Sequence, residues 1–121
     1  MGIQVAKVEK STGVFVISIS GSIDTNTYTV LEKEIDLILQ ATPKAVVLDM
    51  KGVNYMSSAG VRVILKAQRV IQKNKGEFSM VNLQPQIRKV FDIINALPDL
   101  TIFSSVQELD SYLDTMQKKN A

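Results

Sequence analysis

The feature of this sequence that most constrains its fold is a regular alternation of strand-like and helix-like segments. An N-terminal hairpin is predicted over residues 5–19, because β-branched residues flank a turn cluster that contains Gly13. Residues 21–24 are expected to end its second strand, and helical and strand-like apolar patterns then alternate to the C-terminus. Such alternation favours right-handed crossovers between parallel strands. We therefore expect an α/β fold in which the first strand adds an antiparallel edge.

Local signals predict the later elements. The first helix is expected to be capped by Asp24 or Thr25 and to end at Pro43. Residues 50–56 are expected to form a loop, a second helix opens beyond it, and a third ends before Pro98. The strands predicted after the hairpin are residues 45–48, 78–83 and 100–103.

A capping box marks the last helix. Ser105 can accept a hydrogen bond from a first-turn amide while Glu108 reaches back to the cap residue. The residues expected to face the core from this helix are Val106, Leu109, Leu113 and Met116. The chain shows no linker or repeat, so we expect one domain over residues 1–121, with a frayed tail over residues 117–121. The predicted fold is a mixed, mostly parallel sheet of four to five strands with about four helices.

The residue types that are absent exclude several kinds of chemistry. The chain has no His, Cys or Trp, so it has no disulfide, no thiolate nucleophile and no imidazole ligand or base. Asp24 and Asp49 could meet at one end of the sheet, but a helix cap and a strand-end hydrogen bond explain them better than a metal site. We expect no metal, no cofactor and no autonomous enzyme. Ser58 lacks a histidine base, and Lys51 or Lys66 in that role would be conjecture.

Charge and hydropathy argue against nucleic-acid and membrane binding. There are 14 Lys and Arg residues against 12 Asp and Glu, a formal charge of +2, and the basic residues are scattered apart from Lys118 and Lys119. A phosphate-binding footprint needs a clustered basic stripe. No apolar run has the length of a membrane span, and the first residues lack the features of a signal peptide. We expect a soluble, cytoplasmic protein with no nucleic-acid and no membrane partner.

The start of the second helix is the most informative segment. Ser57 and Ser58 open it, where unpaired amides and the positive end of the helix dipole favour negative charge such as phosphate. A glycine inside a helix, such as Gly60, is less stable than Ala by about 1 kcal/mol. Its presence therefore suggests that another group approaches the backbone closely at this position. Tyr55 and Met56 are expected to add an apolar contact surface. A plain structural explanation stays open: Ser57 caps the helix, and small residues permit tight packing.

This segment resembles the signature of STAS-domain anti-sigma factor antagonists. The similar run spans residues 47–65, with Asp49 after the central strand and a serine-containing stretch that opens a helix. Residues 21–24 match the family's Gly-x-Leu/Ile-Asp turn, and residues 100–103 before a capped helix match its C-terminal end. Several matches occur in the same order over essentially the whole chain. The resemblance therefore implies a STAS-like fold.

The resemblance also implies a partner-switching mechanism. An unphosphorylated member of the family binds an anti-sigma factor that is also a serine kinase, and so frees the sigma factor. The kinase uses ATP to phosphorylate the antagonist, and a metal-dependent serine phosphatase reverses this. Aligned on this sequence, the acceptor is Ser58, with Ser57 as a rival because it stands where many members have Asp. The residues implied in partner binding are Asp24, Tyr55, Met56, Ser57, Ala59, Gly60 and Arg62.

Two other functions stay open on the sequence alone. A STAS module could act in another switching pathway that controls secretion, motility or a multiprotein complex. A small-ligand sensor, for nucleotide for example, could use the amides near Ser58 without covalent chemistry, although the sequence has no phosphate loop. The sequence does not determine the oligomeric state.

Overall fold

The computed structural model describes residues 2–96 and 105–119 and shows an α/β fold. Its elements in chain order are β1 (Ile3–Ser11), β2 (Val14–Ile23), α1 (Tyr28–Leu39), β3 (Ala45–Met56), α2 (Ser58–Lys73), β4 (Glu77–Val81), α3 (Pro85–Ala96) and α4 (Val106–Lys119). The sheet has the order β1-β2-β3-β4, with β1 antiparallel to β2 and the other neighbours parallel. The predicted fold class and the antiparallel edge strand are confirmed. The strand predicted over residues 100–103 lies outside the described residues.

The second strand of the hairpin is longer than predicted. At the turn, Gly13 adopts a left-handed φ of +80°, and its N–H donates to the Glu9 carboxylate at 3.0 Å. β2 then continues to Ile23, so the strand ends within residues 21–24 as predicted, but four residues beyond the predicted hairpin end at residue 19. The reason is the neighbouring strand, because β3 also continues and the pairing extends to Ile23 with Met56.

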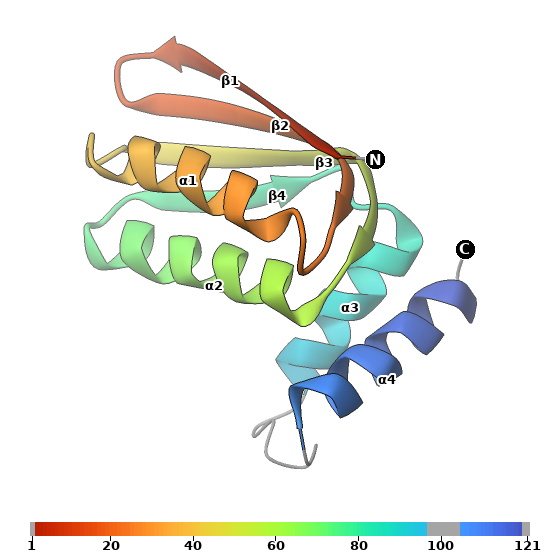
Figure 1. Cartoon of the computed structure of the whole chain (residues 1–121). Helices are drawn as coiled ribbons and strands as arrows, with labels where there is room; N and C mark the ends of the chain where they lie inside the picture. The colour runs from red at the N-terminus through yellow and green to blue at the C-terminus, as the bar shows by residue number, and fades with distance from the viewer. Residues whose placement is uncertain (1, 97–104, 120–121) are drawn as a thin grey trace.

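β3 takes the place of the loop expected over residues 50–56. Met50, Val53 and Met56 are fully buried, at intervals of three residues instead of two. The pairing with β2 shifts register twice, and at each shift β3 contributes one residue more than β2. These bulges interrupt the alternation of side chains, which is why the segment resembles a loop in the sequence. The end of β3 bends over toward α2 (Figure 1).

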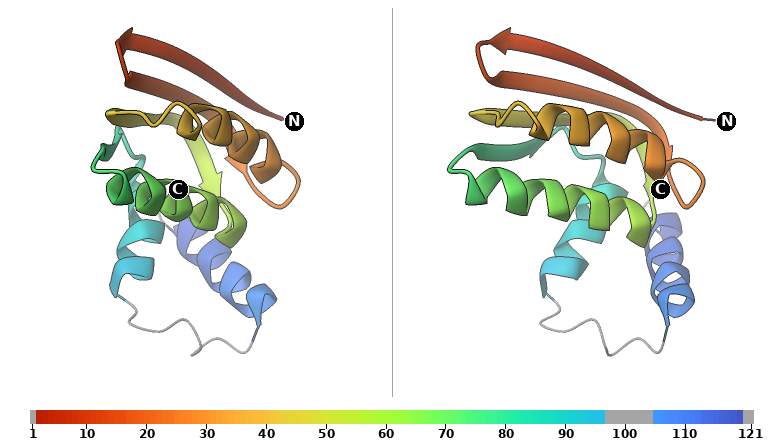
Figure 2. Two further views of the ribbon diagram at one scale, coloured as in Figure 1. Left: turned by 90° about the vertical axis from the view of Figure 1, so that its left-hand side faces the viewer. Right: turned by 60° about the vertical axis from the view of Figure 1, so that its left-hand side comes forward.

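Helices α1 and α2 lie along one face of the sheet, and α3 and α4 lie side by side at the end where β3 leads into α2 (Figures 1 and 2). Buried aliphatic side chains from the sheet and the helices form the core, among them Ile17, Leu31, Leu48, Ile64 and Ile71. Within residues 2–96 and 105–119, no helix is long and apolar enough to cross a membrane.

The buried stripe of α4 differs from the predicted one. Leu109 and Leu113 are buried and Met116 is half-buried, but Val106 is 56% exposed, so the expectation that Val106 faces the core is wrong. Gln117 continues the stripe and is only 3% exposed. The helical period therefore places a polar side chain in a buried position.

The two ends of α4 also test the sequence predictions. At its start, Ser105 Oγ accepts a hydrogen bond from the Glu108 N–H at 3.1 Å, which confirms this half of the capping box. At its end, the helix includes residues 117–119 of the segment that was expected to fray. Residues 120 and 121 lie outside the described part.

Candidate functional site

The predicted phosphate acceptor lies where β3 passes into α2. Ser57 holds the N-cap position in an extended conformation, with φ −93° and ψ 172°, and the helix begins at Ser58. The Ser57 N–H donates to the Ile23 carbonyl at 2.8 Å, which joins this position to the end of β2. The pairing of β2 with β3 therefore determines where the helix starts. We call residues 56–58, together with the part of α4 that contacts them, the α2–α4 junction.

Both serine hydroxyls are buried at this junction. Ser57 is 4% exposed and Ser58 is 8% exposed, and neither Oγ has a hydrogen-bond partner among the described residues. The expectation that the Ser57 side chain caps the helix is wrong, because this residue holds the cap position but makes no side-chain capping bond. An unsatisfied buried polar group costs roughly 1–3 kcal/mol. A function that uses the hydroxyl therefore explains these residues better than stability does.

The capping group of α2 comes from α4. The Asp110 carboxylate accepts a hydrogen bond from the Ser58 N–H at 2.8 Å. A negative charge at this end of a helix interacts favourably with the first-turn amides, typically by about 0.3–1 kcal/mol. The position that the sequence predicts for a phosphate is thus held by a carboxylate of the same chain.

Gln117 attaches α4 to the last residue of β3. Its Oε1 accepts a hydrogen bond from the Met56 N–H at 2.8 Å, and its Nε2 donates to the Met56 carbonyl at 2.7 Å. Nε2 also donates to the Leu113 carbonyl within α4, at 3.2 Å. Because these hydrogen bonds are buried, the side-chain amide satisfies the Met56 peptide groups as a neighbouring strand would.

Met56 and Gly60 belong to the core. Met56 is fully buried, so the expectation that it adds to an exposed apolar surface is wrong for this conformation. A Cβ on Gly60 would lie 2.5 Å from Ile23 Cγ2 and 2.7 Å from Met56 Sδ. The close approach expected at Gly60 is therefore internal packing, as the plain structural explanation predicted. Ala59 is also buried, at 7% exposure.

Tyr55 is half-buried beside several carboxylates. Its burial raises the pKa of its hydroxyl, as do the charges of Asp114 and Asp110, a hydrogen bond with Asp114, and the charge of Asp24. The protonated hydroxyl is the form that can donate to the Asp114 carboxylate, so this hydrogen bond favours it. Tyr55 thus connects β3 with α4 on the outer side of the junction.

Asp24 lies in the turn between β2 and α1. Its Oδ1 accepts hydrogen bonds from the N–H groups of Asn26, at 2.9 Å, and Thr27, at 3.0 Å. The carboxylate therefore stabilises the turn, although Thr27 holds the N-cap position of α1, not Asp24 or Thr25 as predicted. Among the residues predicted for partner binding, Arg62 is exposed and Asp24 and Tyr55 are half-exposed, whereas the others are buried.

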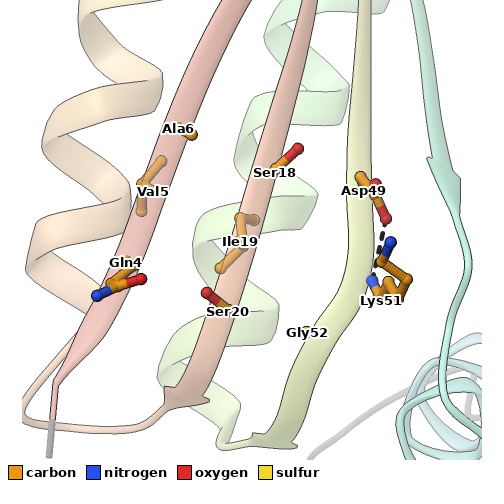
Figure 3. Close-up of a pocket in the computed structure, with 9 residues that line it drawn as sticks. All are labelled: Gln4, Val5, Ala6, Ser18, Ile19, Ser20, Asp49, Lys51 and Gly52. Carbon is orange, nitrogen blue, oxygen red and sulfur yellow. Dashed lines mark hydrogen bonds between the residues drawn. The ribbon is translucent and has the colours of Figure 1, made fainter.

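The face of the sheet opposite α1 and α2 carries a concave feature, with a volume of about 460 Å³ and the lining residues labelled in Figure 3. There Asp49 accepts hydrogen bonds from Asn82 Nδ2 and the Lys51 N–H, at 3.1 Å each, and these bonds hold the pKa of its carboxyl below the ordinary value. Asp49 pairs with Ser18 in the middle of the sheet, so the expectation that it could meet Asp24 at one end is wrong. Within the described ranges, no three His, Cys, Asp or Glu residues are grouped as metal ligands would be.

Two residues of the junction are missing from the sequence prediction. Gln117 lies four residues after Leu113 and eight after Leu109, so helical spacing predicts that position 117 is buried. The position was missed because a glutamine is polar and is not expected in a core. Asp110 has no comparable local signal, because its partner Ser58 is 52 residues away.

The sheet topology, in which the long strand β3 leads into a helix that begins at a serine, is that of a STAS-type fold. Residues 5–109 match the family model of the STAS domain, so the chain belongs to this family. The family resemblance inferred from the sequence is confirmed.

Several proteins similar to this chain are named as anti-sigma factor antagonists. An anti-sigma F factor antagonist of Paenibacillus polymyxa is 25% identical, over 86% of this chain and 100% of that protein. BtrV of Bordetella bronchiseptica is 29% identical over 98 residues, which cover 81% of this chain and 84% of BtrV. The crystal structure of an anti-sigma factor antagonist from Mycobacterium paratuberculosis is similar with a TM-score of 0.70 and 27% identity, covering 83% of this chain and 89% of that one. The chain is thus a STAS-domain relative of anti-sigma factor antagonists.

Proposed function

We propose that this chain is an anti-sigma factor antagonist that works by partner switching. In its unphosphorylated state it binds an anti-sigma factor that is also a serine kinase. Phosphorylation of Ser58 releases that partner, and a serine phosphatase restores the first state. Similarity to named antagonists over most of both chains supports the role. The choice of Ser58 over Ser57 follows the alignment with the family signature. Its support in the structure is that the Ser58 hydroxyl, buried like that of Ser57 without a partner among the described residues, belongs to the first residue of a 16-residue helix.

The added charge explains how one phosphate acts as a switch. A phosphoserine carries a charge of about −1.5 to −2 at neutral pH. The carboxylates of Asp24, Asp110 and Asp114 already lie close enough to Tyr55 to raise its pKa, so a phosphate would make this end of the molecule strongly negative. Like charges brought together at an interface cost several kcal/mol. A loss of roughly 3–4 kcal/mol corresponds to an affinity several hundred-fold weaker.

The proposal assigns the chemistry to the partners. Since the chain has no His and no Cys, Ser58 has no imidazole base and no thiolate stands beside it. The kinase brings ATP and the base, and the phosphatase brings the metal. The chain itself is a cytoplasmic substrate and binding partner that needs no cofactor.

The partner surface is expected to include Asp24, Tyr55 and Arg62, which border the junction and are at least partly exposed. The buried members of the predicted set support this surface from below. Ser57, Ala59 and Gly60 do so by allowing the close packing of α2 on β2 and β3.

Phosphopeptide mapping tests the choice of site. The protein is incubated with its cognate kinase and ATP, digested, and mapped by mass spectrometry, and we expect phosphate on Ser58. Ser58→Ala should abolish incorporation, whereas the matched control Ser57→Ala, which also removes a buried hydroxyl without a described partner, should retain it. Phosphate on Ser57 alone, or undiminished incorporation in Ser58→Ala, would overturn the assignment. Capture by the unmodified protein of a kinase with no link to a sigma factor would overturn the role in transcription.

A further inference from the structure

Helix α4 covers the peptide groups on both sides of Ser57. The Ser58 N–H donates to Asp110, and the Met56 N–H and carbonyl bond to Gln117. The Ser57 N–H, between them, donates instead to the Ile23 carbonyl of β2. Neighbouring amides of one short segment therefore depend on two different elements.

The apolar anchoring of α4 is small by comparison with that of α2. Leu109 and Leu113 are its buried apolar side chains, while Val106 and Tyr112 are 56% and 41% exposed. In α2 the side chains of Val61, Val63, Ile64, Ala67 and Ile71 are all buried. A helix with few buried apolar side chains opens locally at a lower free energy than the core does.

With α4 docked, the Ser58 hydroxyl is not accessible to a kinase. Ser58 is 8% exposed, and phosphoryl transfer requires the serine Oγ to approach the γ-phosphorus of ATP in line with the leaving oxygen. In that transfer the bond from the γ-phosphorus to the bridging oxygen of ADP breaks, a bond to Ser58 Oγ forms, and the hydroxyl proton passes to the kinase base. A buried hydroxyl cannot adopt this geometry while α4 is in place.

The docked helix also occupies the position that a phosphate would take. A phosphate on Ser58 would be attracted to the same first-turn amides that Asp110 now caps at 2.8 Å. The phosphate and the carboxylate carry the same sign of charge, so they would compete for one site and repel each other.

We propose that α4 is a lid over Ser58, which must leave the α2–α4 junction before the kinase can act and which the phosphate then prevents from docking again. This inference rests on the proposed function, because it concerns the regulation of the same serine. In this proposal the Asp110 carboxylate takes the place of the phosphate at the start of α2, and the hydrogen bonds of Gln117 to Met56 hold the lid closed.

Hydrogen exchange tests the lid without any partner. In Gln117→Ala, exchange of the Met56 and Ser58 amides should become roughly 10- to 100-fold faster, as expected for the loss of one or two hydrogen bonds, while the Ser57 amide should keep its protection. Thr115→Ala is the matched control, since Thr115 is exposed and its hydroxyl donates within α4 to the Ser111 carbonyl. Gln117→Glu, which places a buried carboxylate against the Met56 and Leu113 carbonyls, should speed exchange at least as much as Gln117→Ala.

Exchange of amides that do not bond to α4 distinguishes opening of the lid from global unfolding. If Gln117→Ala merely unfolded the protein, the Ser57 amide and the amides in the middle of β2 would exchange faster as well. In that event Asp110→Asn, which keeps an acceptor for the Ser58 N–H but loses the charge, is measured in its place. Equal exchange of Met56 and Ser58 in the wild type and in the variant with an intact fold would overturn the proposal.

The kinase assay separates the lid from the proposed function. With its cognate kinase, Gln117→Ala should be phosphorylated on Ser58 about 10- to 100-fold faster than the wild type, in step with its exchange. Equal rates would overturn the lid and leave the phosphorylation switch intact. Faster exchange with no phosphate on Ser58 in either protein would support the opening of α4 and overturn the proposed function. In the phosphorylated wild type, the Met56 amide should exchange as fast as it does in Gln117→Ala.

Discussion

Two regions of the molecule are stabilised by different interactions. One is the sheet layer, which consists of the sheet with α1 and α2, and the other is the α2–α4 junction. In the sheet layer, side chains such as Ile17, Leu48 and Ile64 are fully buried against one another. At the junction, the half-buried carboxylate of Asp110 and the buried amide of Gln117 bond to backbone groups of Ser58 and Met56. Burial of apolar area is non-directional, whereas a hydrogen bond depends on distance and angle. The interactions of the first region therefore depend little on exact geometry, whereas those of the second require particular distances and angles.

The largest effect is expected in the sheet layer. Leu48→Ala should lower the free energy of unfolding by about 2–5 kcal/mol, because it removes a fully buried side chain and leaves a cavity. Urea denaturation measures this loss. Val81→Ala on β4, where the side chain is 39% exposed, should cost about 1 kcal/mol or less. Equal losses for the two variants would contradict the assignment of the core.

A change of charge at the junction should affect binding more than folding. Phosphorylation of Ser58 should weaken binding to the anti-sigma factor several hundred-fold, or roughly 3–4 kcal/mol, by the like-charge cost argued above. Isothermal titration calorimetry of both forms measures the difference. Ser58→Ala should bind within a few-fold of the wild type. A Ser58→Asp variant that binds the kinase as tightly as the wild type would count against the charge mechanism.

Gly60 lies where the two regions meet. Gly60→Ala should lower the free energy of unfolding by about 1–3 kcal/mol, because its Cβ would lie 2.5 Å from Ile23 Cγ2. Lys66→Ala, at an exposed position of the same helix, should change stability by about 0.5 kcal/mol or less. Stabilisation by Gly60→Ala, which helix propensity alone would predict, would show that Ile23 and Met56 can move aside.

Removal of the carboxylate from the start of α2 should have a smaller effect. Asp110→Asn should lower the free energy of unfolding by about 0.3–1 kcal/mol, since the neutral amide retains an acceptor but loses the charge that the helix dipole favours. Urea denaturation at low and high salt checks the electrostatic origin, because salt screens the loss. Asp92→Asn, exposed on α3, serves as the control. An unchanged stability for Asp110→Asn would show that Asp110 does not cap α2 in solution.

The smallest effect is expected on the open face of the sheet. The pKa of Asp49 is lowered from 3.8 mainly by the hydrogen bond from Asn82, so its contribution to stability is present above that value and is lost as the pH falls through the lowered pKa. In Asn82→Gly the pKa should rise toward 3.8. Glycine is the suitable replacement because Asn82 has a φ of +60°. An NMR titration of the Asp49 carboxyl measures the shift, and an unchanged pKa would remove Asn82 as its cause.

Local patterns predicted the sheet layer well. Continuous apolar runs marked the middle of β2 and β3, and the 3.6-residue period of buried positions marked α1, α2 and α3. These patterns succeed because the sheet and its helices bury side chains at regular intervals. Residues 50–56 were mistaken for a loop because two bulges in β3 break the period.

The sequence by itself determined the α/β fold, the order of its elements and, through the STAS resemblance, the serine at the start of α2. The tertiary structure alone decided that both hydroxyls are buried, that Met56 and Gly60 belong to the core, and that α4 bonds to the start of α2. The physical reason is distance along the chain. Gln117 and Asp110 contact residues 61 and 52 positions away, and no local pattern encodes which distant polar groups will satisfy one another. Their pairing exists only once the sheet and helices have brought the middle of the sequence and its C-terminal part together.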